Sequence, residues 1–404
     1  MDATVRPSST TTLQPAPALE APGAGVEVER FGPKTAHAPT VVVAVPVKDE
    51  AERIGLCLDS LASQEDVDYA DVAVVLLLNN CTDETADQVR LLAPHAPFAT
   101  WMRRVELDSA HANAGWARKL AMDAAADLAA PGGALLTTDA DTLVNSDWIA
   151  ANLRELAEGV DAVAGYVMAD PMELMQLDPA VLDRGRLEWE YQQLAGELTA
   201  RVDREAHDPW PRHNQNCGAS AAITAAVYRA IGGLPPKPVG EDRALFEEVR
   251  RIDGKVRHSL EVQVVTSART DGRASGGLAD EIRLRPDPDH PCDDALEVAM
   301  STLRRALWRC SAREQWIAGR LDPERWAHLL RVSPADVRAA CRRPHFGDAW
   351  SALEALSPRL KRRLVTSNGP RRELRRMRKL VASARTWPAL SAPNDAETRL
   401  AAAS

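Results

Sequence analysis

Short runs of apolar, largely β-branched residues alternate with amphipathic segments from Thr40 onward, and this alternation restricts the folds open to the chain. It is typical of a mainly parallel sheet with helices on its faces. The predicted strands are 40–47, 71–78, 101–107, 134–138 and 160–167. Four helices are predicted. The first contains Ile54, Leu58 and Leu61 at helical spacing, and the second begins near Thr82 or Asp83. The third lies near 114–130 and the fourth covers 146–158. The sequence therefore predicts an α/β domain.

The size and charge of the chain narrow the function classes. With 404 residues, 45% of them hydrophobic, the chain has enough apolar material for one catalytic-sized domain and additions to it. A formal net charge of −9 argues against a nucleic-acid binder, which needs positive charge to replace phosphate counterions. Residues 301–385 nevertheless hold 21 Lys or Arg against seven Asp or Glu.

Composition also suggests domain boundaries. Residues 1–38, rich in Pro, Ala and Thr, are predicted to be a disordered tail, and 386–404 a second tail. Between them we expect the α/β domain over 39–280, a linker over 281–292 and a basic helical extension over 293–385. The tryptophans of this extension would form its core and the basic runs its solvated face. The alternative is that the basic runs contact an anionic membrane or a partner protein.

Six cysteines without close pairs or zinc-type spacing fit reduced thiols. The first residues lack a basic stretch followed by an apolar core, and no segment approaches the roughly 18 apolar residues of a membrane span. We therefore expect a cytoplasmic protein without a transmembrane segment.

Polar clusters follow three of the predicted strands. They are "PVKDE" after 40–47, "NNCTD" after 71–78 and "TDADT" after 134–138. Ligands of parallel sheets bind at the carboxyl ends of the strands, so three such clusters predict one site. If the last cluster is extended, Asp139 and Asp141 point the same way and present both carboxylates to one cation, Mn²⁺ or Mg²⁺. Taken alone, an acidic pair at a strand end is more often part of a turn or a helix cap than a metal site.

Five motifs occur in an order and spacing that resemble the family-2 glycosyltransferases. They are "VVVAVPVKDEAERIGLCLDSL", "LLLNNCTDETA", "NAGWARKLAMDAA", "LLTTDADTLV" and "VGEDRALFEEVRRIDGKV". The resemblance covers about residues 40–275 and implies a GT-A fold, which is a Rossmann-like nucleotide-binding α/β domain. It also implies an inverting enzyme that uses a nucleotide-sugar donor and holds Mn²⁺ or Mg²⁺ on the donor diphosphate.

The resemblance assigns roles to individual positions. The metal would be held by Asp139 and Asp141, and the catalytic base would be Asp242. The nucleotide sugar would be bound by Pro46, Glu50, Asn79, Asp83, Arg118, Lys119, Asp139, Asp141, Arg269 and Arg273. The acceptor would be bound by Asn216, Gly218 and Glu241. Asn79 stands where family members often have an aspartate, so the identity of the base is less firmly implied.

Several of these residues also have a structural interpretation. Asp242 could be an acid at a helix N-terminus, Arg118 and Lys119 a solvated helix face, and the two loop arginines partners of surface carboxylates. His258 could complete a metal site in the manner of some relatives, but a lone histidine beside a strand is more typical of a structural residue.

The activity implied is the transfer of one sugar to an acceptor hydroxyl, with a UDP-sugar favoured as donor. The Q-x-x-R-W sequence of processive synthases is absent. Two alternatives stay open: a haloacid-dehalogenase-like phosphohydrolase, because "DADTLV" approaches its D-x-D-x-T/V motif, and a glycosyltransferase-like binding protein without turnover. A dinucleotide-dependent dehydrogenase is disfavoured because no glycine-rich turn follows the first strand.

Overall fold

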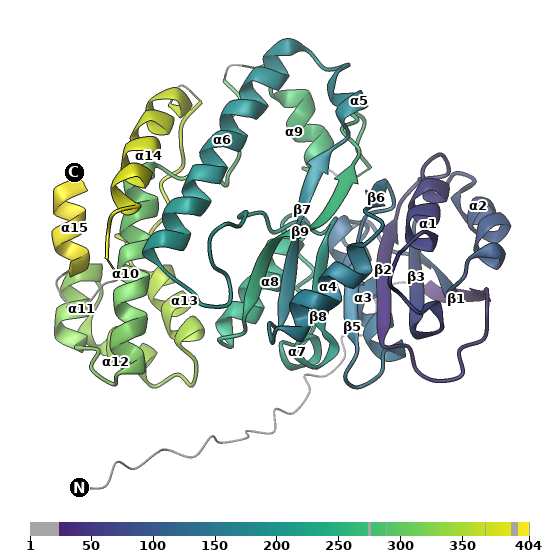
Figure 1. The fold of residues 1–404 in the computed structure, drawn as a ribbon, viewed down its shortest axis with the longest axis horizontal. Coiled ribbons are helices and arrows are strands. Elements are labelled where there is room, and N and C mark those ends of the chain that lie inside the picture. Colours follow the sequence, from purple (N-terminus) through teal and green to yellow (C-terminus); the bar gives the residue numbers. More distant parts are fainter. Residues whose placement is uncertain (1–23, 274–275, 288, 368, 389–394, 404) are drawn as a thin grey trace, which may run out of the picture.

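The computed structural model describes residues 24–273, 276–287, 289–367, 369–388 and 395–403. They form an α/β unit built on one sheet and a helical unit that contains the C-terminal helices (Figure 1). Between the two lies a long helix, α6 (Pro179–Val202). This arrangement confirms the predicted α/β fold class with a C-terminal helical region.

A nine-stranded sheet runs through the described residues in the order β1-β4-β3-β2-β5-β8-β7-β9-β6. Its central strands β4, β3, β2 and β5 are parallel, and antiparallel strands flank them. The strands are β1 (Ala24–Phe31), β2 (Val41–Val47), β3 (Val72–Asn79), β4 (Ala99–Glu106), β5 (Ala134–Thr137), β6 (Thr142–Val144), β7 (Ala162–Ala169), β8 (Ala221–Thr224) and β9 (Val256–Thr266). All five predicted strands are present, with ends shifted by one or two residues.

Helices cover both faces of the sheet. The helices before α6 are α1 (Ile54–Ala62), α2 (Thr85–Leu92), α3 (Ala114–Leu128), α4 (Trp148–Ala157) and α5 (Pro171–Leu174); after it come α7 (Ala225–Ala230), α8 (Glu241–Arg251) and α9 (Leu278–Leu284). In β2, Val41, Val43 and Val45 belong to the core cluster that contains residues of α1, α2 and α4, whereas Val42 and Ala44 belong to the one that contains residues of α3, α7 and α8. Burial on both faces explains why the central strands are unbroken apolar runs.

The prediction of a disordered tail over 1–38 is wrong for residues 24–31. These residues form β1, the antiparallel edge strand beside β4. Val26 and Val28 are exposed, so backbone hydrogen bonds and ion pairs hold the strand, such as Glu27 with Arg104 at 2.9 Å. An argument from apolar burial therefore misses it. Residues 1–23 lie outside the described part of the chain.

The C-terminal helices share one apolar core with α6. They are α10 (Ala299–Ile317), α11 (Pro323–Leu330), α12 (Pro334–Cys341), α13 (Phe346–Leu356), α14 (Pro370–Ala384) and α15 (Asp395–Ala403). Trp308, Trp326 and Trp350 are buried in this core, as predicted, together with Tyr191 and Leu198 of α6. The helical region is thus packed onto the α/β unit.

Two predicted boundaries in this region are wrong. The linker predicted over 281–292 begins inside a helix, because residues 281–284 belong to α9. The tail predicted over 386–404 contains α15, whose Ala396 is buried in the core around α10. Both helices are short, so they give little sequence signal, and packing stabilises them. Within the described residues, no helix has the length and apolarity to cross a bilayer.

Candidate active site

Three loops meet at one edge of the sheet. Strands β3, β2 and β5 are parallel neighbours and end at Asn79, Val47 and Thr137. The polar clusters that follow these strands therefore start at the same edge, as predicted from the sequence.

The segment that carries Asp139 and Asp141 is a turn, so the prediction that it is extended is wrong. The turn joins β5, in the middle of the sheet, to β6, which pairs antiparallel with β9 at its end. The amide of Thr142 donates to the carbonyl of Asp139 at 3.1 Å, and the hydroxyls of Thr142 and Thr266 are 2.9 Å apart. Pairing with β9 brings Asp141 next to the residues that follow Thr266.

Asp141 faces an arginine from that loop. Nη2 of Arg269 lies 3.1 Å from Oδ2 of Asp141, and the same guanidinium forms a two-pronged ion pair with Glu50, its Nη1 donating to Oε2 at 2.9 Å. Burial raises the pKa of Asp141 to about 6, and the negative charge of Asp139 adds to the shift, while Arg269 opposes it. Asp141 is thus a desolvated carboxylate beside a like charge.

Asp139 faces a different arginine. Arg118, on α3, has a side chain only 7% exposed and donates from Nη2 to Oδ1 of Asp139 at 2.8 Å. It also donates from Nε to Oε1 of Glu241 and from Nη1 to the carbonyl of Gly218, each at 3.1 Å. Arg118 therefore links the turn after β5 with the segment before β8 and with the start of α8.

Asp242 lies in the first turn of α8, next to Glu241. Its Oδ2 accepts from the amide of Gly218 at 3.0 Å and its Oδ1 from the amide of Arg243 at 2.7 Å. The helix follows Gly240, whose φ of 76° lies in the left-handed region that glycine adopts readily. Asp242 is partly exposed, whereas the carboxylate of Glu241 is buried against Arg118. The two adjacent acids thus occupy different environments.

Asp83 and Asn79 lie in the neighbouring loops. Asp83 accepts from the amides of Thr85 at 3.0 Å and Ala51 at 3.1 Å, so it joins the loop after β3 to the loop after β2. Its pKa is lowered, because hydrogen bonds from Thr85 and Ala51 outweigh the opposing effect of burial. Asn79 is buried at the end of β3, and within the described residues its Oδ1 accepts no hydrogen bond.

Four further predicted residues are not among the hydrogen-bond partners of Arg118. Pro46 is in β2 and partly exposed, and Arg273 donates from Nε to the carbonyl of Asp49 at 3.1 Å. Nη2 of Arg250 donates to Oδ1 of Asn216 at 3.3 Å. Lys119 is buried and pairs with Asp123 one turn along α3, at 2.8 Å. The structure thus gives Lys119 partners outside the carboxylate network.

The sequence argument missed Glu173, in α5. Its Oε2 accepts from the hydroxyl of Ser267 at 2.8 Å and the amide of Ala268 at 2.6 Å, and its Oε1 pairs with Arg53 at 2.8 Å. These bonds fix the start of the loop that carries Arg269. Ser267 is 94 positions away from Glu173, so no local motif could reveal the contact.

His258 contacts a carboxylate outside the paired aspartates, that of Asp208. It is buried, and its Nδ1 lies 2.7 Å from Oδ2 of Asp208. Burial lowers the pKa of His258 to about 4, against the opposing effect of Asp208. The structural interpretation of this histidine is the one that its contacts support.

The donor set can be tested for its fit to a divalent cation. Asp139 and Asp141 supply carboxylate oxygens, which are ligands that divalent cations such as Mg²⁺ prefer. A nearby cation would offset the desolvation and the charge repulsion that raise the pKa of Asp141. Among the described residues, no group of three or more His, Cys, Asp or Glu could hold a metal. The two carboxylates thus fit a cation that takes its other ligands from a substrate and water, as Mg²⁺ commonly does in phosphate sites.

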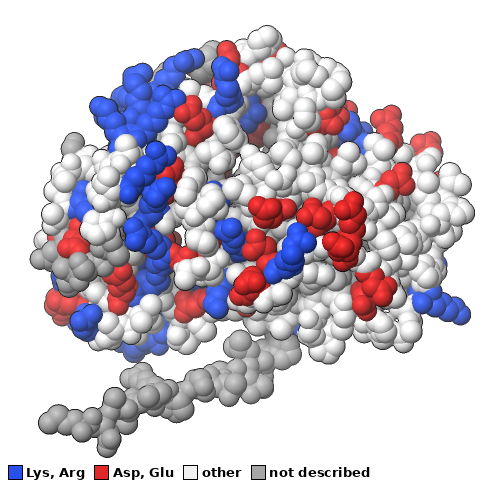
Figure 2. Space-filling model, in the orientation of Figure 1, with Lys and Arg blue, Asp and Glu red and all other residues white. Residues whose placement is uncertain are grey.

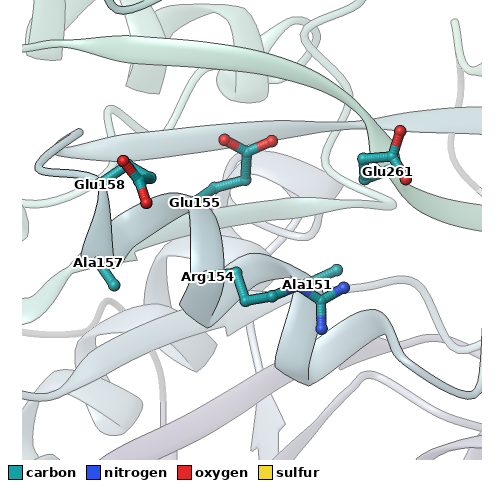
Figure 3. A pocket seen from close by; sticks show the side chains of 6 residues that line it. All are labelled: Ala151, Arg154, Glu155, Ala157, Glu158 and Glu261. Carbon is teal, nitrogen blue, oxygen red and sulfur yellow. The ribbon is translucent and has the colours of Figure 1, made fainter.

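Two pockets lie away from this network. One is lined by residues of α4 and by Glu261 of β9, and Figure 3 shows Glu155 and Glu158 on the helix side of it. The other lies in the helical region, between α10 and α14. Neither includes a residue predicted for the active site.

The paired aspartates and the carboxylates at the start of α8 lie at the edge of the sheet where α/β proteins bind their ligands. Residues 42–201 match the family model described as glycosyl transferase family 2. The match covers residues 42–201 of the 404, so this part of the chain is similar to a family-2 glycosyltransferase domain.

Solved structures that are similar to this chain include a mannosyltransferase. The mannosyltransferase PcManGT of Pyrobaculum calidifontis, in complex with GDP-Man and Mn²⁺, has 19% identity and a TM-score of 0.41 over 92% of this chain and 81% of its own. S. aureus TarS 1–349, in complex with UDP-GlcNAc, has 14% identity and a TM-score of 0.44 over 78% of this chain and 89% of its own. At these values the similarities add no argument to the family match. No curated protein matches the chain.

Proposed function

We propose that the protein transfers a single sugar from a nucleoside-diphosphate sugar to an acceptor hydroxyl, with inversion at the anomeric carbon and with Mn²⁺ or Mg²⁺ as cofactor. The observation that carries the proposal is the network through Arg118, which ties Asp139, from the paired aspartates, to the start of α8, where Asp242 lies. This network supports a single site for the proposed donor-side and acceptor-side carboxylates.

On the donor side, Asp139 and Asp141 would hold the cation. A divalent cation bound there would stabilise the negative charge that develops on the departing nucleoside diphosphate. Glu50 and Asp141 hold Arg269 at this position, and Arg273 follows in the same loop. Guanidinium groups bind diphosphates through forked donors, so this loop would cover the leaving group.

The base and ribose would lie over the ends of β2 and β3. Asn79 offers a buried acceptor, its Oδ1, for which the described residues provide no donor. Such an atom is costly to bury unless a ligand donates to it, as an N–H of a nucleobase or a ribose hydroxyl would. We infer that Asn79 contacts the nucleoside, and we favour uridine because of the family resemblance.

On the acceptor side, the carboxylate of Asp242 is better placed as a base than that of Glu241. Asp242 is partly exposed and accepts only backbone N–H groups, so a lone pair stays available to an acceptor hydroxyl. Glu241 is buried and paired with the guanidinium of Arg118. Removal of the hydroxyl proton by Asp242 during attack from the face opposite the leaving group would give inversion in one displacement.

The test is a thermal-shift panel of UDP, GDP, CMP and dTDP compounds with the full chain, with and without Mn²⁺. We expect a uridine nucleotide to raise the melting temperature only together with the cation, and Asp141→Asn to abolish that shift. The Lys119→Gln variant is the matched comparison, because Lys119 pairs with Asp123. A nucleotide shift that is equal with and without Mn²⁺ would reject the metal-dependent donor site.

The alternatives are less well supported. A phosphohydrolase would need Asp139 as a nucleophile, yet its Oδ1 accepts from the guanidinium of Arg118. A binding protein without turnover is distinguished by donor hydrolysis with Mn²⁺, which we expect to be measurable and to depend on Asp141. A cytoplasmic location stays a prediction, supported by six cysteines without a disulfide.

A further inference from the structure

The helical region contains a pocket that the proposed transfer reaction does not use. It lies between the start of α10, the segment before α14, α14 itself and the end of α15. It is lined by Val298, Met300, Arg363, Arg372, Glu373, Arg376, Lys379, Leu380 and Ala403. Four of these nine residues are cationic and four are apolar. The pocket therefore combines positive charge with an apolar wall.

The charge around this pocket is strongly unbalanced. Residues 359–379 contain ten Lys or Arg and one acid, Glu373. Figure 2 shows Lys and Arg side chains gathered over the part of the molecule where Figure 1 places α14. Among the described residues, six of the ten have no carboxylate partner; they are Arg359, Lys361, Arg363, Arg371, Arg375 and Lys379. This density is unusual in a chain with a net charge of −9.

The single acid of the segment orients two of the pocket cations. Glu373 is 1% exposed, and its Oε2 accepts from the amide of Ala299 at 3.1 Å. Its Oε1 lies 2.7 Å from Nη1 of Arg376 and 3.5 Å from Nε of Arg372. One buried carboxylate thus holds two guanidinium groups at the pocket and leaves a surplus of positive charge.

The crowding of like charge extends to α10. Arg304 is partly buried, and within the described residues its Nε atom has no hydrogen-bond partner. Burial lowers the pKa of Arg304, and the positive charges of Arg359 and Arg363 lower it further. An anion seated next to Arg363 would relieve this repulsion.

We propose that this pocket binds the phosphate group of an anionic membrane lipid and so docks the enzyme on a bilayer surface. The four pocket cations would bind the phosphate, and Val298, Met300 and Leu380 would contact the apolar part next to it. A small soluble phosphate would need only the pocket. The unpaired cations outside it, such as Arg371 and Arg375, are explained by a surface that carries many phosphates.

The experiment measures binding of the full-length chain to vesicles by co-sedimentation. The vesicles are phosphatidylcholine alone, or an equimolar mixture with phosphatidylglycerol. The pocket variant is Arg363→Gln with Lys379→Gln, since both side chains are exposed and neither has a carboxylate partner in the described residues. The matched control is Arg371→Gln with Arg375→Gln, which removes the same charge from α14 outside the pocket.

We expect binding to the anionic vesicles only, and a loss of about tenfold or more in affinity for the pocket variant. The control should lose clearly less. Equal losses in the two variants would overturn the pocket site in favour of diffuse attraction. Absence of vesicle binding would overturn the proposal. It would also be overturned if inorganic phosphate raised the melting temperature of the parent protein and not of the pocket variant, while the two proteins bound vesicles equally. Donor hydrolysis should be the same in all three proteins, which keeps this test separate from that of the transfer reaction.

Discussion

At the scale of single residues, the clearest contrast is between two adjacent acids. Glu241 and Asp242 follow one another at the start of α8, yet Arg118 neutralises the first, while the second accepts only backbone hydrogen bonds. Their sequence positions alone do not show which acid is structural. The groups that contact each carboxylate distinguish the two acids. Substitution of Asp242 is therefore expected to lower the rate of transfer, and substitution of Glu241 to lower stability.

We expect Asp242→Asn to lower the rate constant for transfer by roughly 10²–10⁴-fold, because an amide cannot accept the hydroxyl proton. Donor affinity should change little, since the described contacts of Asp242 are with backbone amides and not with Asp139 or Asp141. Steady-state kinetics with donor binding measured separately would check this. A loss of donor affinity as large as the loss of rate would reject Asp242 as the base.

The comparison variant is Glu241→Gln. Removing one partner of a buried ion pair costs about 3–5 kcal/mol of stability, because the other charge stays buried. We therefore expect Glu241→Gln to lower the urea midpoint, whereas Asp242→Asn leaves it nearly unchanged. If the Glu241 variant kept full stability and lost its activity, Glu241 would be the base and Asp242 the structural acid.

At the scale of elements, the segment before β8 shows how backbone and side chains are fitted together. A β-carbon at position 218 would lie 2.4 Å from Cζ of Arg118, so only glycine leaves room for that guanidinium. Gly218 also contributes its carbonyl to Arg118 and its amide to Asp242. This glycine is therefore required by the side chain that packs on it.

We expect Gly218→Ala to cost about 1–3 kcal/mol of stability through overpacking and to reduce transfer, because Arg118 must leave Asp139 and Glu241. Gly196→Ala is the control, since a β-carbon there would lie at an ordinary contact distance of 3.5 Å from Cβ of Asn214. In a helix interior this change should be neutral or stabilising. Equal effects of the two substitutions on activity would contradict the role given to Gly218.

The elements differ in how well the sequence predicts them. Strands β2, β3 and β5 are buried on both faces and read as continuous apolar runs, so they were predicted correctly. Strand β6 has three residues and β8 is mostly alanine, so neither has a recognisable pattern. Strand β1 is stabilised by its ladder with β4, a partner about 75 positions away that no local window contains.

In the candidate site, too, residues in local motifs could be predicted from the sequence, whereas contacts between distant positions could not. Asp139, Asp141 and Asp242 lie in short motifs and were identified from them. The link between them was not, because Arg118 meets Asp139 at a separation of 21 residues and Glu241 at 123. Arg118 was expected to contact the nucleotide, and its burial beneath the carboxylates follows from the packing of α3 on the sheet.

At the scale of the whole molecule, ion pairs join the α/β unit to the helical region. Glu205, in the loop after α6, lies 3.0 Å from Nη1 of Arg309 and 2.8 Å from Nη1 of Arg313, both on α10. In the same segment between α6 and β8, His213 is buried, with Nε2 at 3.0 Å from the carbonyl of Ala164 and Nδ1 at 3.1 Å from the amide of Gln215. The second contact needs a neutral ring.

The burial of His213 predicts a loss of stability in mild acid. Burial lowers the pKa of His213 to about 3, whereas its value in an unfolded chain is 6.5. The unfolded chain therefore binds a proton that the folded chain excludes. The stabilising contribution is complete above pH 6.5 and decreases as the pH falls, by about 1.4 kcal/mol per pH unit for this histidine. Urea unfolding at several pH values measures it.

His213→Gln tests the assignment, since a glutamine can donate and accept but does not titrate. We expect a flatter pH dependence between pH 6.5 and 4.5, whatever its effect on stability at neutral pH. His95→Gln, at an exposed position, should leave the slope unchanged. If the two variants showed the same slope as the parent protein, His213 would not be the group that titrates.

Helix α6 determines how far the two units of the molecule can change independently. One side of it meets the α/β unit, and Tyr191, Leu198 and Val202 belong to the core of the C-terminal helices. The family domain, 42–201, ends inside this helix. If the C-terminal helices were deleted, the apolar side of α6 would be exposed to solvent. Such a deletion would therefore require polar substitutions on α6 as well.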